Sequence, residues 1–230
     1  MNNDIVIVTG GTSGLGYELV KQLIEKGYFV CNLSKNQDRL QQMHIEFTNN
    51  YKSFCGDISD ESFIRDTVKE IDNIGNIIGL INNADKGIFK LPTDYLKKDI
   101  DLCSKGLFGM ILLTSEVLKV KNEKNLKIIN IMSSAALRGN KQESVYCAMK
   151  WGQRGYTESL KAAYKGTSVK VIGVYPGGIN TNFYNNSRDY VSEEKQNTFM
   201  NPKDVATIIV DNAFNNINLT VSDLVIERNQ

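Results

Sequence analysis

Short apolar runs rich in β-branched residues alternate along the chain with longer stretches in which apolar residues recur at helical spacing. Strands of a parallel sheet are buried on both faces and read as continuous apolar runs, whereas the helices that connect them show one apolar stripe. The pattern therefore predicts an α/β fold, with a mostly parallel, doubly wound sheet of seven strands and helices on both faces.

The predicted strands are Ile5–Val8, Phe29–Leu33, Lys52–Phe54, Ile77–Ile81, Lys127–Ile131, Val169–Val174 and Leu224–Ile226. The predicted helices are Gly14–Lys26, Gln37–Phe47, Asp60–Ile71, Leu96–Val120, Glu143–Tyr164 and Lys203–Asn215. Two residues mark helix starts: Asp60 suits an N-cap, and Pro202 suits a first helical turn because its ring fixes φ.

The chain shows no linker rich in Pro or Ser and no internal repeat, so we expect one domain over residues 1–230. The segment Asn180–Asn201 breaks the alternation, since it is polar, contains aromatic residues and has no clear period. Long irregular segments in compact domains are often lids or binding loops, the alternative being disorder. We favour a substrate lid at residues 180–201.

Charge and composition narrow the class of partner. The 27 basic and 26 acidic residues give a net charge of +1, which offers no bulk attraction for nucleic acid or an acidic membrane. The four cysteines form no CxxC pair, the one histidine, His44, has no second ligand at zinc-like spacing, and no apolar run approaches the ~20 residues of a membrane helix. We expect a soluble, cytoplasmic protein with a small-molecule partner and no metal.

A glycine-rich turn follows the first predicted strand. It reads Thr9-Gly-Gly-Thr-Ser-Gly-Leu-Gly16 and leads directly into a predicted helix. Glycines allow a tight turn and let a pyrophosphate approach bare N–H groups, and the helix N-terminus adds a positive dipole. The spacing differs from the commoner GxGxxG, so a purely structural turn is the alternative, but the strand before and the helix after favour a Rossmann-type dinucleotide site.

The end of the second strand bears on which dinucleotide is bound. NAD-preferring sites usually place an Asp or Glu there for the ribose 2′-hydroxyl. This chain has Ser34 and Lys35 instead, and Lys35 could pair with a 2′-phosphate while Ser34 donates a hydrogen bond; a solvated surface lysine is the alternative. We therefore predict NADP(H) as the preferred cofactor, with NAD(H) possible.

A hydroxyl, a phenol and an amine recur at informative spacing in the second half of the chain. Ser133 lies 13 residues before Tyr146, and Lys150 follows four residues later, which places Tyr146 and Lys150 on nearly one face of a helix. A nearby ammonium lowers a tyrosine pKa from about 10 toward the range needed for acid–base work. Spacing alone is weak evidence, because Tyr17 and Lys21 share it, and we interpret that pair as structural.

In order along nearly the whole chain, these motifs resemble the short-chain dehydrogenase/reductase family. The glycine turn resembles TGxxxGxG, Asn82-Asn83-Ala84 resembles the start of NNAG, and Tyr146-x3-Lys150 resembles the family's YxxxK. Asp57-Ile58 resembles the pair that contacts adenine, and Pro176-Gly177-Gly178-Ile179-Asn180-Thr181 the loop that closes on the nicotinamide.

The resemblance implies roles for individual residues. Tyr146 is the expected general acid/base, Ser133 holds the substrate oxygen, and Lys150 binds the nicotinamide ribose; Ser134 is a rival for the serine role. It also implies a homodimer or homotetramer. The full set expected at the cofactor is Gly10, Thr12, Ser13, Gly14, Leu15, Gly16, Ser34, Lys35, Asp57, Ile58, Asn82, Ala84, Tyr146, Lys150, Pro176, Gly177, Ile179 and Thr181.

Two positions depart from the family pattern. Alignment on Lys105-Gly106 puts Cys103 where relatives carry a catalytic asparagine, and Asp85 replaces the glycine of NNAG. Asp85 either faces solvent or brings a repulsive carboxylate near the cofactor. The leading hypothesis is an NADPH-dependent reductase of ketones or aldehydes, or the reverse dehydrogenase. A regulator or scaffold that binds NADP(H) with little turnover is the main alternative, and a nucleotide-sugar epimerase is disfavoured by the glycine spacing.

Overall fold

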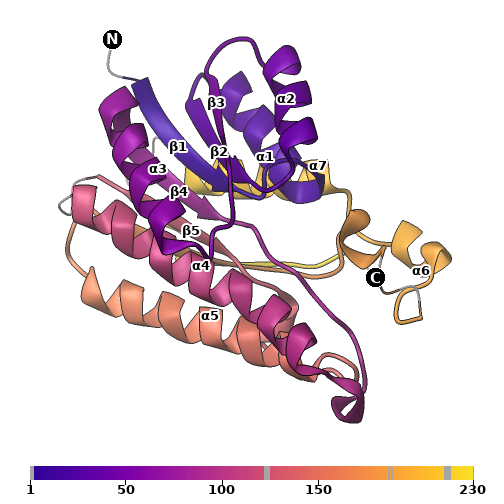
Figure 1. Ribbon diagram of the computed structural model, residues 1–230. Coiled ribbons are helices and arrows are strands. Elements are labelled where there is room, and N and C mark those ends of the chain that lie inside the picture. The colour runs from indigo at the N-terminus through magenta and orange to yellow at the C-terminus, as the bar shows by residue number, and fades with distance from the viewer. Residues whose placement is uncertain (1–2, 122–124, 186, 188, 215–218, 230) are drawn as a thin grey trace.

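The computed structural model describes residues 3–121, 125–185, 187, 189–214 and 219–229. Seven parallel strands form one sheet in the order β3-β2-β1-β4-β5-β6-β7. Helices cover both faces of this sheet (Figure 1). The predicted α/β fold class is confirmed.

The strands are β1 (Asn3–Thr9), β2 (Phe29–Ser34), β3 (Tyr51–Cys55), β4 (Gly75–Asn82), β5 (Lys127–Ile131), β6 (Lys170–Pro176) and β7 (Asp223–Ile226). The α-helices are α1 (Gly14–Glu25), α2 (Gln37–Glu46), α3 (Glu61–Ile74), α4 (Lys97–Lys121), α5 (Ser144–Ala163), α6 (Glu193–Asn197) and α7 (Pro202–Ala213). Three 3₁₀ turns complete the described elements: η1 (Pro92–Asp94), η2 (Ser134–Ala136) and η3 (Asn182–Tyr184).

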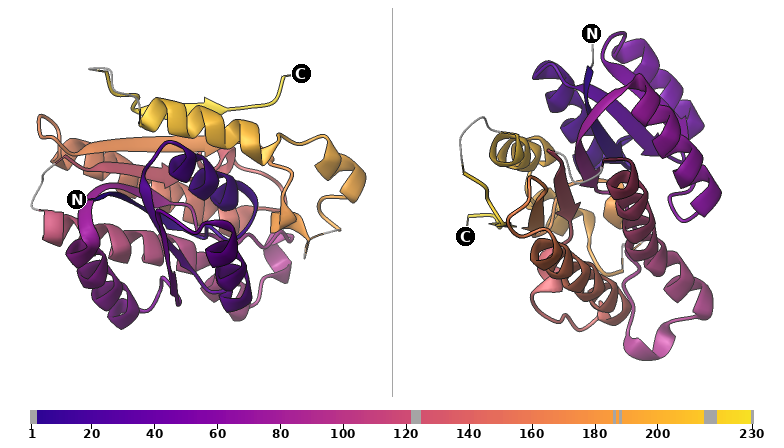
Figure 2. Two further views of the ribbon diagram at one scale, coloured as in Figure 1. Left: turned by 90° about the horizontal axis from the view of Figure 1, so that it is seen from above. Right: turned by 90° about the vertical axis from the view of Figure 1, so that its left-hand side faces the viewer.

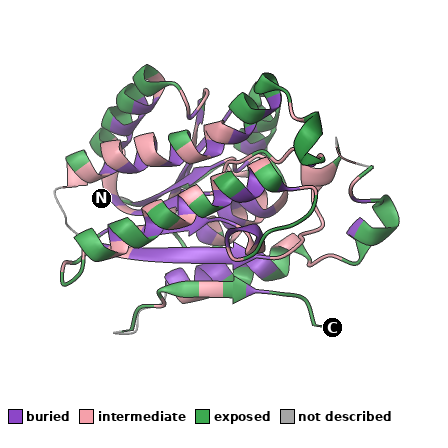
Figure 3. Cartoon of the chain, turned by 90° about the horizontal axis from the view of Figure 1, so that it is seen from below, coloured by how far each residue is buried: buried purple, intermediate pink, exposed green. Residues whose placement is uncertain are grey.

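Strand β1 shows why the apolar runs are continuous. Successive side chains of a strand point to opposite faces, and both faces of β1 are covered. Val6 and Val8 pack in the core formed with α1 and α7, while Ile5 and Ile7 pack in the core formed with α3, α4 and α5. Figure 3 shows the resulting layers, with a buried sheet between helices that are exposed on their outer sides.

Most predicted elements lie within a few residues of the observed ones, and the predicted starts are explained by local chemistry. Asp60 caps α3, since its carboxylate accepts hydrogen bonds from the N–H groups of Ser62 and Phe63. Pro202 is in the first turn of α7. The short elements η1, η2, η3 and α6 were not predicted, because a single turn is too short to show a period.

The sheet topology places the candidate site. From β1 the chain builds outward through β2 and β3, then returns to β4 on the other side of β1. Ligands of open α/β sheets bind at the carboxyl ends of the strands where the order reverses. The loops after β1, β4, β5 and β6 all leave from this edge, and the segment with η3 and α6 extends beyond it (Figures 1 and 2).

The described part of the chain contains neither a membrane-spanning helix nor a cluster of metal ligands. None of its helices has the length and apolar character needed to cross a membrane. The same residues contain no group of three or more His, Cys, Asp or Glu side chains arranged to hold a metal ion.

Candidate active site

A cleft of about 490 Å³ runs along the carboxyl edge of the sheet. It brings together the glycine turn, the ends of β2, β4 and β5, helix α5 and the loop after β6. Every residue expected at the cofactor or the reaction centre lines it except Asn82. The cleft is also lined by Asn36, Lys86 and Lys105, which the sequence did not assign to the site, and by Asp85, Phe183 and Tyr184.

The glycine turn has the geometry that a pyrophosphate requires. Gly10 and Gly14 have φ of 67° and 53°, a backbone region that residues with a Cβ rarely adopt. A Cβ on Gly14 would lie 2.9 Å from Thr181. Ser13 is the N-cap of α1, yet its side chain makes no capping hydrogen bond, so the first N–H groups of the helix face the cleft without a side-chain partner. This turn therefore fits a dinucleotide phosphate.

The loop after β4 is fastened to the glycine turn by Thr9. Its hydroxyl accepts hydrogen bonds of 2.9 Å from the N–H groups of both Asn83 and Ala84. Asn82, one residue earlier, points into the interior, where its amide donates to Asn130 Oδ1 at 2.8 Å and Thr114 Oγ1 at 3.0 Å. Asn82 thus supports the site from inside the sheet, and a direct contact with cofactor stays a prediction.

Two lysines and an aspartate lie at the far end of the cleft, beside β2 and β3. Asp57 accepts hydrogen bonds from Lys35 Nζ at 2.7 Å and Lys105 Nζ at 2.8 Å. Burial acts to raise the pKa of Asp57, but the bonds from Lys105, Lys35 and Ser59 together hold it well below its ordinary value. Lys105 belongs to α4, more than forty residues from Asp57 in sequence, so no local motif could have assigned it.

The candidate reacting groups lie at the start of η2 and in α5. Ser133 ends the β5 region, and its Oγ accepts a hydrogen bond from the Ala135 N–H at 3.1 Å. Ser133 lines the cleft and acts to lower the pKa of Tyr146, whereas Ser134 is not part of the described lining. The geometry therefore favours Ser133 over Ser134 for the serine role.

Tyr146 is buried, with 8% of its surface exposed. Burial, then the negative charge of Asp85 and the nearby Tyr184, raise the pKa of Tyr146 well above its ordinary value, against the opposing effect of the Ser133 hydrogen bond. The sequence had led us to expect a pKa lowered by Lys150. In this structure the ammonium lies 5.5 Å from the tyrosine ring centre, but a carboxylate neutralises it.

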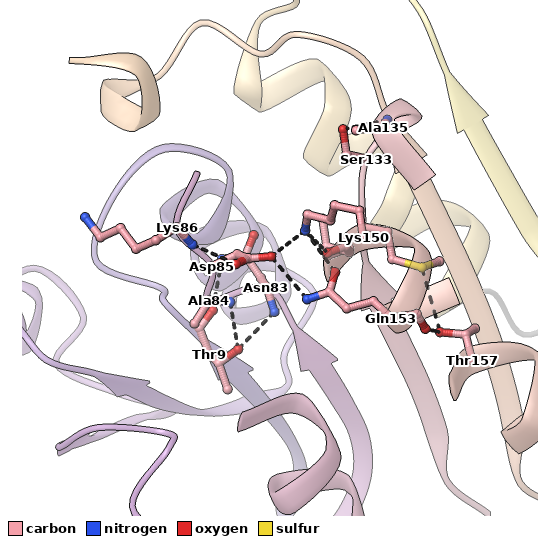
Figure 4. A network of polar contacts seen from close by, with 12 residues as sticks. Thr9, Asn83, Ala84, Asp85, Lys86, Ser133, Ala135, Lys150, Gln153 and Thr157 are labelled. Carbon is pink, nitrogen blue, oxygen red and sulfur yellow. Dashed lines mark hydrogen bonds and ion pairs between the residues drawn. The ribbon is translucent and has the colours of Figure 1, made fainter. Parts of the chain in front are cut away.

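That carboxylate is Asp85. Its Oδ2 lies 2.6 Å from Lys150 Nζ, and the two side chains are only 8% and 2% exposed. Figure 4 shows Asp85 pointing toward Lys150 and Gln153, while the side chain of Lys86 turns away. The alternative that Asp85 faces solvent is therefore wrong. Its position in sequence suggested nothing about Lys150, because the two residues lie on different elements that meet only in the folded sheet.

Aromatic side chains cover the reaction end of the cleft. Phe89 stacks on Tyr190 and Tyr184 at centroid distances of 4.7 and 5.6 Å and contacts the ring of Tyr146 edge-on at 5.3 Å. The ring centroid of Phe183 lies 6.0 Å from that of Tyr146. The Tyr190 hydroxyl also donates a hydrogen bond to the carboxylate of Glu143, which fastens the segment before α6 to the start of α5. The space beside Tyr146 is thus mainly aromatic.

Tyr17 repeats the spacing of Tyr146 but not its surroundings. Its hydroxyl donates to Glu46, a bond that leads the causes raising the pKa of Tyr17 to about 12, and its ring packs near Phe47. Neither Tyr17 nor Lys21 is part of the described lining of the cleft. This geometry agrees with a structural role for the pair.

Comparison with known proteins now adds to the geometry. The sequence model described as short chain dehydrogenase matches residues 4–191. The chain belongs to the short-chain dehydrogenase family. A probable NADP-dependent dehydrogenase of Haemophilus influenzae is 27% identical over 222 residues, covering 91% of this chain and 87% of the relative. Carbonyl reductase family member 4 of Xenopus laevis is 33% identical, covering 77% of this chain and 76% of the relative.

Solved structures of other short-chain dehydrogenases share the whole fold. The closed form of a serine dehydrogenase complexed with NADP+ superposes with a TM-score of 0.89 at 25% identity, covering 96% of this chain and 94% of that one. A short-chain dehydrogenase/reductase from Vibrio parahaemolyticus gives a TM-score of 0.85 at 27% identity, covering 97% and 96%. This short-chain dehydrogenase is an oxidoreductase, and its glycine turn fits the NAD(P) that such enzymes use.

Cys103 differs from its neighbours in the site. The thiol is buried, and burial is the main cause that raises the pKa of Cys103 above its ordinary value. It is outside the described lining of the cleft, although the charge of Asp85 reaches it. In this short-chain dehydrogenase the Cys103 thiol is therefore buried and neutral, within electrostatic reach of Asp85.

Proposed function

We propose that this short-chain dehydrogenase reduces a ketone or aldehyde to an alcohol with NADPH, or catalyses the reverse oxidation. Tyr146 donates its phenolic proton to the carbonyl oxygen, which Ser133 holds by a hydrogen bond. Lys150 binds the nicotinamide ribose. The cofactor, when bound, supplies the hydride.

The observation that supports this proposal most strongly is that Tyr146 lines the same cleft as the other expected groups. Its phenol is protonated at neutral pH, as a general acid must be, although burial and Asp85 raise its pKa away from the range in which acid catalysis is most efficient. Its partner Ser133 lines the same cleft as the glycine turn. One cleft therefore combines a protonated phenol, a second hydroxyl and a turn that fits a dinucleotide. This combination suits proton transfer to a carbonyl oxygen as hydride arrives.

The aromatic walls support an apolar or aromatic carbonyl substrate. Phe183 and Tyr184 line the cleft beside Tyr146, and both belong to the segment 180–201 that we propose as the lid of a single domain spanning residues 1–230. Gln196 of α6 ties that segment to its own start, since its amide donates to Asn180 Oδ1 and to the Thr181 carbonyl. A homodimer or homotetramer in the cytoplasm belongs to the same proposal.

The test of turnover is a panel of aromatic and aliphatic ketones and aldehydes, followed by NADPH absorbance. We expect measurable reduction by the wild-type chain and a loss of at least about 100-fold in kcat for Tyr146→Phe, since general acid catalysis typically contributes that much. Tyr17→Phe is the matched control because it removes the same hydroxyl from the same residue spacing outside the cleft. Equal rates for wild type and Tyr146→Phe would contradict the proposed role of Tyr146.

The preference for NADPH rests on the far end of the cleft. No acid stands at the end of β2, and Lys35 and Lys105, which share the Asp57 carboxylate, line the cleft together with Ser34. We expect Lys35→Ala to weaken NADPH binding while leaving NADH binding nearly unchanged. Lys52→Ala is the matched control, because Lys52 is also a half-exposed lysine in an ion pair, with Glu70. A tenfold or larger kinetic preference for NADH in the wild-type chain would refute this part.

A second function is favoured by two features of the site. Asp85 holds Lys150, the residue that should bind the cofactor ribose, and Cys103 stands where relatives carry an asparagine. Both features suit a regulator or scaffold that binds NADP(H) with little turnover. Tight NADPH binding without reduction of any carbonyl in the panel would favour this alternative over the reductase.

A further inference from the structure

The hydrogen bonds of Lys150 leave its ammonium fully engaged. An ammonium has three N–H donors. Lys150 Nζ lies 2.6 Å from Asp85 Oδ2, 3.0 Å from Gln153 Oε1 and 3.4 Å from the Ile131 carbonyl oxygen. A ribose hydroxyl that accepts a hydrogen bond from Lys150 must therefore replace one of these partners.

Asp85 is held in place by more than the ion pair. Its Oδ1 accepts a hydrogen bond from the Lys86 N–H at 2.7 Å, and its Oδ2 accepts a second one from Gln153 Nε2 at 3.1 Å. The helix α4 makes room for the carboxylate at Gly106, where a Cβ would lie 2.2 Å from Asp85 Oδ1. The fold thus contains a site that fits this one carboxylate.

This carboxylate site is part of the wall of the candidate cofactor cleft. Asp85, Lys150 and the glycine turn all line this cleft. The carboxylate of Asp85 holds the ammonium that would otherwise meet the ribose of a cofactor in this cleft.

We propose that Asp85 is a positioning residue that competes with the nicotinamide ribose for the Lys150 ammonium and so limits how tightly this chain holds NADPH. The inference rests on the proposed role of Lys150 at the ribose. Asp85 keeps Lys150 beside Tyr146 in the cofactor-free protein, and cofactor binding takes one ammonium donor from the carboxylate.

The experiment compares NADPH with its adenosine bisphosphate half, which lacks the nicotinamide ribose. Dissociation constants of the full chain are measured by calorimetry for wild type and for Asp85→Asn, which keeps the shape of the side chain and removes its charge. We expect Asp85→Asn to bind NADPH about tenfold more tightly, the gain of one charge-assisted hydrogen bond. The affinity for the adenosine half should stay within about twofold, as expected for a site remote from the change.

Asp99→Asn is the matched control. Asp99 is also a carboxylate with 8% side-chain exposure, and it pairs with Lys90 at 2.7 Å outside the described lining of the cleft. It should alter neither dissociation constant. Asp85→Gly, which has no side chain to misplace, should repeat the gain for NADPH if the asparagine variant proves unstable.

Three results would overturn the proposal: an unchanged NADPH affinity in Asp85→Asn, a weaker one, or an equal gain for both ligands. A weaker affinity would mean that the carboxylate only supports the fold, and an equal gain would mean a general charge effect. These constants need no turnover. A wild-type chain that reduces no carbonyl while Asp85→Asn gains NADPH affinity would refute the proposed reductase and support the inference about Asp85.

Discussion

Replacing Lys150 with methionine removes the positive member of the buried Asp85–Lys150 pair while keeping a side chain of similar length. The Asp85 carboxylate, 8% exposed, is then left without a counter-ion. Removing one partner of a buried pair costs about 3–5 kcal/mol of unfolding free energy, and for a chain of this size that corresponds to a fall in Tm of roughly 10 °C. Urea and thermal unfolding of the cofactor-free chain at pH 7 measure both quantities.

A double-variant cycle tests the physical reason. Asp85→Asn combined with Lys150→Met removes both charges, so the loss in the double variant should be smaller than the sum of the two single losses by at least about 1 kcal/mol. Lys90→Met is the control, and because the Lys90 side chain is 35% exposed we expect a smaller loss there. Losses of Asp85→Asn and Lys150→Met that simply add would show that the two charges do not stabilise each other.

Three further predictions concern residues that line the cleft. Gly106→Ala should lower unfolding free energy by about 1–3 kcal/mol, since its Cβ would lie 2.2 Å from Asp85 Oδ1, and should cost little in an Asp85→Gly background; chemical denaturation of both variants tests this. Because Asp57 has a lowered pKa, its stabilising effect is present above the ordinary value of 3.8 and is lost progressively as pH falls below it; the difference in unfolding free energy between wild type and Asp57→Asn should therefore narrow in urea titrations as pH falls from 5 to 2. Because the pKa of Tyr146 is raised, its contribution to stability is complete below the unfolded pKa near 10 and is lost as pH rises above it. The Tm of Tyr146→Phe, followed by thermal scans, should therefore fall less steeply with rising alkaline pH than the Tm of wild type.

The fold was largely predictable because it is encoded by local pattern. The central strands are mainly apolar, and the main helices show apolar stripes toward one of the two cores. The parallel pairing of the strands follows from repeated strand–helix alternation, whereas the strand order came only from the structure. What the pattern lacks is any signal for single turns, so η2, which positions Ser133, and α6 in the proposed lid came only from the structure.

The candidate site was predictable wherever its residues belong to contiguous motifs. The glycine turn, Ser133, Tyr146 and Lys150 all line one cleft, as the sequence suggested. Lys105 was missed because it pairs with Asp57 across two elements, and Asn82 points inward because its amide completes a buried network with Asn130. Such pairings depend on three-dimensional proximity, which spacing along one chain does not report.

Asp85 shows how a change in one motif is accommodated by another. A carboxylate at this position requires a cation within reach and space for its oxygens, and the structure supplies the first from Lys150 of α5 and the second from Gly106 of α4. Replacing Lys150 leaves the buried Asp85 charge unpaired, and replacing Gly106 with a larger residue causes steric overlap with the carboxylate. Each change should lower the free energy of unfolding. Residues 85, 106 and 150 therefore form one coupled unit, and substitutions among them should show strong non-additivity in stability, whatever substrate the cleft accepts.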